Sequence, residues 1–190
     1  MTAPKSSHII WDLPLRIFHW ALAGLVIANL IIGEISPNDM SIHFYLGYAI
    51  MGLLIFRMIW GFVGPKNARF VNFIYGPRTT LKYAKTLPVR KPSHWDGHNP
   101  VGALSVFALL GILSIQSFTG LFADPEDYIN TGPLAGTVDT ATNQLASGWH
   151  ETLSSLLIAL IVLHLGAILF YKIWKKDNLI TPMILGKRRK

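Results

Sequence analysis

Cysteine is absent from the 190-residue chain. Its absence excludes disulfide bonds, thiolate metal sites, cysteine-ligated iron–sulfur clusters and covalent haem attachment through a Cys-x-x-Cys-His motif. Any cofactor must therefore be held by other side chains. Histidine, of which the chain has seven, is the obvious candidate.

Charged residues are also scarce, at 14% of the chain. Four long apolar runs cover roughly residues 18–35, 42–63, 101–123 and 149–174. Each can cross a hydrocarbon core about 30 Å thick at about 1.5 Å per helical residue. A soluble bundle would carry polar outer faces, which these runs almost entirely lack. We therefore predict an all-α fold, a transmembrane four-helix bundle formed by residues 1–190 as one domain. No cleaved signal peptide is expected, because the first run is long for one.

Basic residues are confined to alternate segments of this predicted topology. Lys5 and Arg16 precede the first run, the segment 64–100 is rich in Lys and Arg, and a basic tail closes the chain. The segments 36–41 and 124–148 carry only acidic charges. This positive-inside pattern places both termini and the loop 64–100 in the cytoplasm and the loop 124–148 in the periplasm. The predicted location is the bacterial cytoplasmic (inner) membrane.

The net charge of +7 is therefore a topology signal, and no nucleic-acid partner is expected. Membrane lipid is the partner that this basic surface indicates. A short helix around residues 79–86, between Pro77 and Pro88, can rest its basic face on anionic headgroups. Asn99 and Pro100 are typical of an N-cap and a first-turn proline, and they open the third run.

Four histidines, His19, His43, His150 and His164, lie inside or at the mouth of an apolar run. His150 and His164 are fourteen positions apart, which is about 40° short of four helical turns, so they share a face at levels about 21 Å apart. In the predicted topology, His19 lies at the depth of His164 and His43 at the depth of His150. Each histidine alone could be a bonded core residue, but an ionisable group within a span favours a function.

Two imidazoles from facing helices can hold a six-coordinate haem iron. The spacing therefore predicts two non-covalent b-type haems between the helices, one on His43 and His150 near the outer surface and one on His19 and His164 further inward. With both axial positions filled, the iron lacks an open site for oxygen, so electron transfer is the natural task. A histidine-based metal or proton transporter and a haemless anchor subunit are the alternatives.

Three further residues are candidates for the inner site. Arg57 is fourteen positions after His43, and its guanidinium either binds a haem propionate or snorkels to the interface. Arg16 is a second propionate candidate. His98 can bond a propionate, line a proton route to a quinone, or be an interfacial histidine in contact with water. Glycines such as Gly33 leave room for a macrocycle, although close helix contact explains them equally well.

Several motifs spread over nearly the whole chain resemble one known family. They are the stretch 11–20 (WDLPLRIFHW), His43 with 46–48 (LGY), 57–64 (RMIWGFVG), 97–102 (GHNPVG), 149–151 (WHE), His164 and 181–187 (TPMILGK). Together they resemble the prokaryotic cytochrome b561 group, which includes the b-type cytochrome subunits of nickel–iron hydrogenases. The resemblance implies a four-helix core, two b haems ligated by His19, His43, His150 and His164, and electron exchange between a membrane quinone and a partner.

Members of this group serve hydrogenases, periplasmic cytochromes or molybdoenzymes, and a few oxidise superoxide. The acidic outer loops of this chain should attract a basic partner such as a soluble cytochrome and repel superoxide. We therefore expect electron transfer between the quinone pool and a periplasmic cytochrome or redox enzyme subunit, with superoxide oxidation coupled to quinone reduction as the alternative. The quinone is expected at the inner side, near Arg57, His98 or the loop 64–99. Whether the chain is an enzyme in its own right, and whether it forms homo- or hetero-oligomers, stays open.

Overall fold

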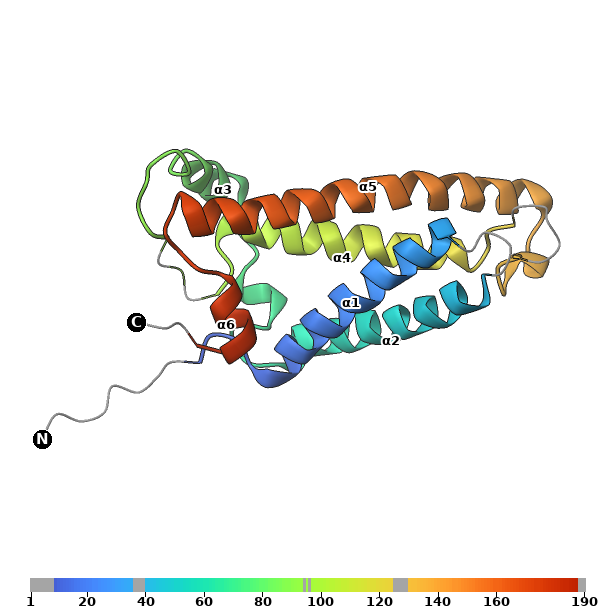
Figure 1. Cartoon of the computed structure of the whole chain (residues 1–190), viewed down its shortest axis with the longest axis horizontal. Coiled ribbons are helices and arrows are strands. Elements are labelled where there is room, and N and C mark those ends of the chain that lie inside the picture. The colour runs from blue at the N-terminus through green and yellow to red at the C-terminus, as the bar shows by residue number, and fades with distance from the viewer. Residues whose placement is uncertain (1–8, 36–39, 94, 96, 125–129, 188–190) are drawn as a thin grey trace, which may run out of the picture. The chain divides into compact units, whose positions relative to one another are not determined.

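The described part of the chain is helical throughout. The computed structural model describes residues 9–35, 40–93, 95, 97–124 and 130–187, and no β-strand occurs among them. Figure 1 labels the six α-helices of these residues, and two short 3-10 helices lie between them in the chain. They are α1 (Leu13–Ile35), α2 (Ser41–Val63), η1 (Phe70–Asn72), α3 (Pro77–Ala84), α4 (Pro100–Gly120), η2 (Ala135–Thr137), α5 (Thr140–Ile173) and α6 (Ile180–Leu185). The predicted all-α class is confirmed.

Helices α1, α2, α4 and α5 are each long and apolar enough to cross a membrane. In their most apolar stretches only 11% to 22% of the residues are buried inside the protein. Large apolar side chains such as Val162 and Leu163 are therefore left exposed, at 64% and 67%. Exposing such side chains to water costs about 25 cal/mol per Å² of apolar surface, a cost that a lipid environment removes. The chain is a multi-pass membrane protein.

Two helices begin earlier than the apolar runs indicated, because polar caps extend them. Helix α1 begins at Leu13, where Asp12 Oδ2 accepts a hydrogen bond from the Leu15 amide at 3.4 Å. Helix α5 begins at Thr140 instead of near residue 149, since Asp139 Oδ1 accepts from the Thr142 amide at 2.7 Å. That bond lowers the pKa of the Asp139 carboxyl. An apolar run marks the part of a helix that lipid can cover, whereas the residue at which the helix begins depends on the capping side chain.

The start of α4 and the helix in the preceding loop agree with the sequence signals. Asn99 Oδ1 accepts from the Gly102 amide at 2.8 Å, and Pro100 is buried at the first helical position. In the preceding loop, α3 forms where a surface helix was predicted and begins at Pro77 itself. Proline suits both starts because its missing N–H would have no partner in the first turn.

The chain divides into two compact units, each built from several separate segments. The first unit comprises the described residues within Met1–His19, Arg57–Ser105 and Leu163–Lys190, and the second those within Trp20–Phe56 and Val106–Val162. Helices α1, α2, α4 and α5 each contribute residues to both units. Each unit therefore contains parts of all four long helices.

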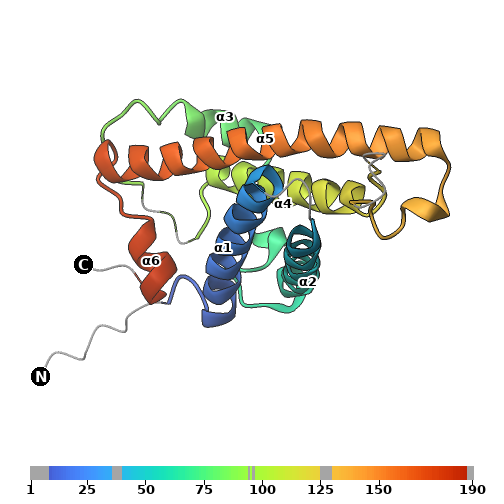
Figure 2. The same cartoon turned by 45° about the vertical axis from the view of Figure 1, so that its right-hand side comes forward.

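In the first unit, hydrogen bonds tie the start of the described chain to its end. The Ile10 amide donates to the Gly186 carbonyl at 2.7 Å, and α6 lies beside the start of α1 in Figure 2. Gly186 ends α6 with a φ of +78°, a left-handed conformation that glycine adopts without strain. Trp60 Nε1 donates to Asp12 Oδ2 at 2.9 Å, which fixes the end of α2 beside the start of α1.

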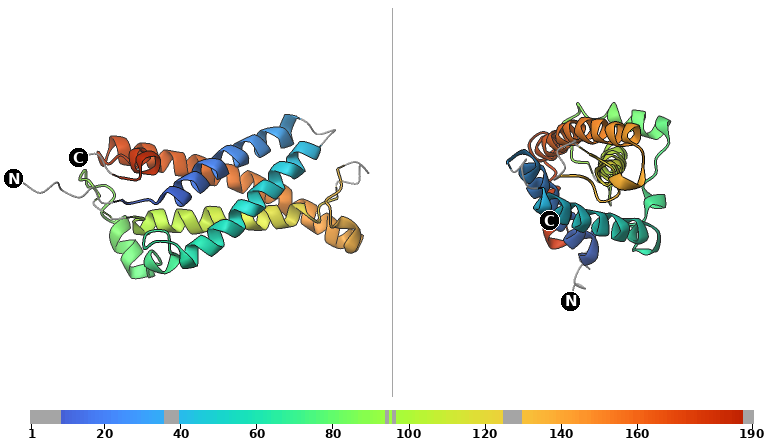
Figure 3. Two further views of the ribbon diagram at one scale, coloured as in Figure 1. Left: turned by 90° about the horizontal axis from the view of Figure 1, so that it is seen from below. Right: turned by 90° about the vertical axis from the view of Figure 1, so that its right-hand side faces the viewer.

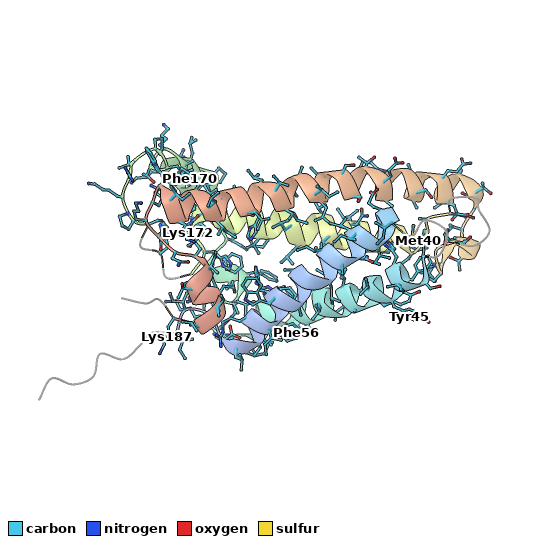
Figure 4. The ribbon with its side chains drawn as sticks, in the orientation of Figure 1. Met40, Tyr45, Phe56, Phe170, Lys172 and Lys187 are labelled. Carbon is cyan, nitrogen blue, oxygen red and sulfur yellow. The ribbon has the colours of Figure 1, made fainter. Side chains whose placement is uncertain are left out.

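Polar contacts also hold α3 and the loop after it against the end of α5. Tyr83 Oη lies 2.8 Å from Tyr171 Oη and 2.6 Å from Ser93 Oγ. Lys175, which follows α5, donates from Nζ to the carbonyls of Thr86 and Val89 at 2.8 and 2.7 Å. Lys172 and Lys187, labelled in Figure 4, belong to the same unit.

The second unit is the four-helix bundle proper. Its buried cluster joins all four long helices through Val26, Ile50, Leu54, Leu113 and Leu157. The segment between α4 and α5, yellow to orange in Figure 3, folds back on the end of α4. There the Gly132 amide donates to the Ala123 carbonyl at 2.7 Å.

Candidate functional site

In the first unit, the structure brings His19 of α1 and His164 of α5 together. Their ring centroids are 6.5 Å apart, and the rings are inclined by 47°. Ser105 of α4 places its hydroxyl oxygen 3.5 Å from His164 Nδ1. Both histidines are half-buried. This is one of the two pairs predicted from sequence.

In the second unit, His43 of α2 faces His150 of α5. Their ring centroids are 6.1 Å apart, with 76° between the ring planes. His150 Nδ1 lies 2.9 Å from the Gln116 carbonyl oxygen, and His43 Nδ1 lies 3.3 Å from that of Asn29. A carbonyl oxygen only accepts, so Nδ1 carries the proton in each of these bonds. The lone pair at Nε2 is then available to a metal ion.

A cavity of about 540 Å³ lies next to this second pair. Its size falls within the range typical of cofactor sites, about 300–1,000 Å³. Apolar side chains from α1, α2, α4 and α5 make up much of the wall, with a few polar groups among them. Its lining includes His43, His150, Glu34, Glu151, Asn29, Gln116, Gly33, Gly47 and Gly120.

Two glycines of this cavity approach the imidazoles closely. A Cβ atom on Gly120 would lie 2.7 Å from His150 Cε1, a contact that essentially never occurs in proteins. A Cβ atom on Gly33 would lie 3.4 Å from His43 Nδ1. Gly33 was a candidate in the sequence, but close helix packing explained it equally well. In the structure the space that both glycines leave is occupied by the rings of the histidine pair.

Arg57, in the first unit, is only 2% exposed. Its Nη2 donates to the Ala68 carbonyl at 3.0 Å, and its Cζ lies 4.3 Å from the centre of the Phe70 ring. Within the described part of the chain, Nη1 is buried and has no hydrogen-bond partner. The guanidinium reaches past the end of α2 at Val63 to the loop that follows it, so both roles considered from sequence stay predictions. A buried guanidinium with an open donor suits an anion.

Arg16 and His98 also belong to the first unit. Arg16 Nη1 donates to the Ile184 carbonyl in α6. The His98 ring lies between Trp11 and Phe73, with centroids 4.6 and 4.4 Å away, and no described residue bonds its enclosed Nδ1. Burial lowers the pKa of His98 to about 3, with further contributions from Arg57 and His19, so the ring is neutral at physiological pH. The His98 ring is therefore flanked by aromatic rings, and the residue as a whole is half-buried.

Comparison with known proteins identifies the family. A family model described as prokaryotic cytochrome b561 matches residues 10–186. The chain belongs to the prokaryotic cytochrome b561 family. Membership makes it a b-type cytochrome, a protein that binds haem b and transfers electrons. No solved structure matches the chain.

Two curated relatives match this b561 chain over nearly its whole length. It is 25% identical to the probable Ni/Fe-hydrogenase 1 B-type cytochrome subunit of Escherichia coli (strain K12), over 96% of this chain and 91% of the relative. It is 26% identical to the probable Ni/Fe-hydrogenase B-type cytochrome subunit of Rhizobium leguminosarum bv. viciae, over 97% of this chain and 90% of that relative. The likeness thus extends over nearly the full length of both proteins.

The geometry of both histidine pairs fits a haem b between the rings. Two imidazoles that held one iron between them would have ring centres about 6.4–6.6 Å apart, given metal–nitrogen bonds of about 2.0–2.1 Å and about 1.2 Å from each nitrogen to its ring centre. The observed centroid distances are 6.1 and 6.5 Å. In the second unit the protonated Nδ1 atoms leave Nε2 as the donor that such an iron requires.

Sequence reasoning missed the groups that orient these imidazoles. The Nδ1 partners of His43 and His150 are main-chain carbonyls of Asn29 and Gln116, and every residue type carries that group. Gly120 had a detectable signal, since it is a glycine near the end of the third apolar run, but its contact with His150 depends on helix packing. Phe70, which lies under the Arg57 guanidinium, had no distinguishing signal in the sequence.

Proposed function

We propose that this b561-family protein is a dihaem cytochrome of the cytoplasmic (inner) membrane that passes electrons between membrane quinone and a redox enzyme at the periplasmic face. The observation that carries the proposal is the pair of facing imidazoles in each unit, with ring centroids 6.1 and 6.5 Å apart. One haem would be held by His43 and His150, the other by His19 and His164. Held by two histidines each, such haems would supply one-electron exchange.

The protein's own groups would orient these ligands and balance the charge of the cofactor. In the second unit, the carbonyls of Asn29 and Gln116 hold the imidazoles by Nδ1. In the first unit, Arg57 is the proposed partner of a propionate, because its buried Nη1 has no other acceptor among the described residues. Arg16 and His98, in the same unit, are proposed to contribute to this end of the site.

Charge distribution supports an orientation with both termini in the cytoplasm. All 17 lysines and arginines of the sequence fall within the sequence ranges of the first unit. By the positive-inside rule, the loops and tail that carry these charges face the cytoplasm, in a chain that we propose to be a single integral membrane domain. His43 and His150 lie near the acidic loops, so their haem would be the one toward the periplasm and would receive electrons from the partner. Quinone would bind on the cytoplasmic side, near Arg57, His98 or the loop 64–99.

A nickel–iron hydrogenase is the first candidate for the partner. Both relatives described above carry the name of a hydrogenase cytochrome subunit. In such a pairing, oxidation of one hydrogen molecule would release two electrons, and one quinone would take up two electrons and two protons to become a quinol. A basic periplasmic cytochrome is the second candidate, because the outward loops are acidic. The same acidity disfavours superoxide as a substrate.

Haem content of the purified protein tests the ligand assignment. The wild-type chain should bind two haems and give the reduced-minus-oxidised spectrum of a b-type cytochrome. His150→Ala and His164→Ala should each lose one haem and keep the other. Leu163→Ala is the matched control, because this neighbour of His164 is 67% exposed and should keep both haems. Two haems in both histidine variants would refute the assignment.

Reaction with quinone tests the acceptor separately. Pre-reduced protein mixed anaerobically with a water-soluble quinone should be reoxidised, with one quinol formed for every two haems oxidised. If the haems are present but stay reduced, the quinone part of the proposal is wrong while the haem assignment stands. A colourless purified protein would instead favour an anchor or a transporter. A metal transporter would need a site for its ion. Among the described residues, no group of three or more His, Cys, Asp or Glu side chains is placed to hold a metal ion.

A further inference from the structure

Opposite charges are separated between the two units. Every lysine and arginine of the sequence lies in the ranges of the first unit, and the second unit's ranges contain none. Seven of the ten acidic residues lie in the second unit's ranges: Glu34, Asp39, Asp124, Glu126, Asp127, Asp139 and Glu151. Membrane topology explains where the chain carries basic loops. It does not require the histidine pairs themselves to lie in opposite fields.

The same contrast holds at the level of the sites. The cavity beside His43 and His150 has Glu34 and Glu151 in its wall, and none of its lining residues is Lys or Arg. In the first unit, which holds His19 and His164, Arg57 is a buried cation. The first pair therefore shares its unit with a buried cation, and the second pair shares its cavity with two carboxylates.

This contrast sets an order of reduction potentials. A haem centre carries one more positive charge when oxidised than when reduced, so a nearby cation favours the reduced form and a nearby carboxylate the oxidised form. We propose that the haem held by His19 and His164 has the higher reduction potential, and that electrons run downhill from the second unit to the first. The inference rests on the proposed pair of haems.

Arg57 makes the largest contribution to this difference. Its charge is shielded from water at 2% exposure, whereas Glu34 and Glu151 are exposed and partly screened. Asp12 lies close enough to Arg57 to offset part of its field. At an effective dielectric constant of about 20, a unit charge about 10 Å from an iron changes the oxidised-to-reduced ratio on the order of tenfold.

The order of potentials gives the electron path a direction. With the basic segments toward the cytoplasm, electrons would enter at the His43 and His150 pair and leave from the His19 and His164 pair. That direction suits a donor outside the membrane, such as a hydrogenase, and a quinone as the acceptor. It disfavours oxidation of quinol by this protein as the main reaction.

An anaerobic redox titration followed by visible spectroscopy tests the order. His150→Ala keeps the haem assigned to the first unit, and His164→Ala keeps the other, so the two potentials can be assigned. The haem that remains in His150→Ala should have a higher reduction potential than the haem that remains in His164→Ala. Equal potentials, or the reverse order, would overturn the inference. Two haems present in wild type with equal potentials would leave the proposed function standing, whereas fewer than two would refute that function itself.

Charge variants test the cause. Arg57→Gln should raise the oxidised-to-reduced ratio of the first unit's haem on the order of tenfold at fixed ambient potential, about 59 mV for one electron. Arg57→Lys keeps the charge and should restore most of the difference. Arg78→Gln removes the same charge from an exposed position of α3 and should have a smaller effect. Equal shifts in Arg57→Gln and Arg78→Gln would show that net charge, not the buried guanidinium, sets the potential.

A test from the other unit does not depend on how well Arg57 variants fold. Glu151→Gln removes an exposed carboxylate from the cavity wall. It should raise the potential of the haem held by His43 and His150 and leave the other unchanged. No shift, or a downward shift, of the second unit's haem would contradict the proposal.

Discussion

Gly120 offers a sharp test of the haem site in the second unit. A methyl group there would lie 2.7 Å from His150 Cε1 and 3.1 Å from its Nδ1. Ordinary carbon contacts are about 3.5–4.0 Å, so Gly120→Ala forces the imidazole to move by about 0.8 Å. The movement takes Nδ1 away from the Gln116 carbonyl, to which it bonds at 2.9 Å.

The cost of this movement depends on whether His150 holds a metal. Without haem, the ring ends a side chain that can rotate away, so the variant loses one hydrogen bond of about 0.5–1.5 kcal/mol. With haem, the iron fixes the ring. Disturbing the groups that orient a metal ligand typically costs about 10- to 100-fold in metal affinity. We therefore expect Gly120→Ala to lose haem from the second unit and to keep the first unit's haem.

The assay is haem per chain in purified protein, followed by titration with added haem. Gly111→Ala is the matched control, because Gly111 is on the same helix and its Cβ would meet nothing within 4 Å. The control should keep both haems. The reasoning is refuted if Gly120→Ala binds two haems with wild-type affinity, or if Gly111→Ala loses haem equally.

Three further predictions concern the first unit. Asn99→Ala removes the cap on the Gly102 amide, so we expect a loss of about 1 kcal/mol in thermal stability that Asn99→Asp largely restores; equal stability of all three proteins would contradict this. Trp60→Phe removes the bond to Asp12 and should cost about 1.5–3 kcal/mol with an unchanged haem spectrum, and a changed spectrum would place Trp60 at a haem. The pKa of His98, about 3 in the folded protein, lies below its unfolded value, so between these values the unfolded chain binds more protons and stability must fall as pH decreases from about 6.5 toward 3. Melting temperatures of wild type and His98→Gln over that range should converge at low pH, and parallel curves would show that His98 does not cause the loss.

Periodicity and charge in the sequence were enough to predict the helices and the histidine levels. Apolar length predicted the four long helices, and the segregation of Lys and Arg predicted their orientation, which stays a prediction. The fourteen-residue spacing of His150 and His164 follows from the helical repeat, which holds wherever a helix is continuous. For that reason the sequence could predict which imidazoles share a level, and the structure brings the same pairs together.

Only the tertiary structure decided what surrounds those imidazoles. The contact between Gly120 and His150 depends on how α4 packs against α5, and the bond from His150 to Gln116 uses a main-chain carbonyl. The sequence did not mark the Ala68 carbonyl and the Phe70 ring as the groups that hold the Arg57 guanidinium. Helical repeat and hydropathy act along one segment and can be read from it. Contacts between segments depend on helix rotation and on main-chain groups common to all residues, so no local pattern of side chains specifies them.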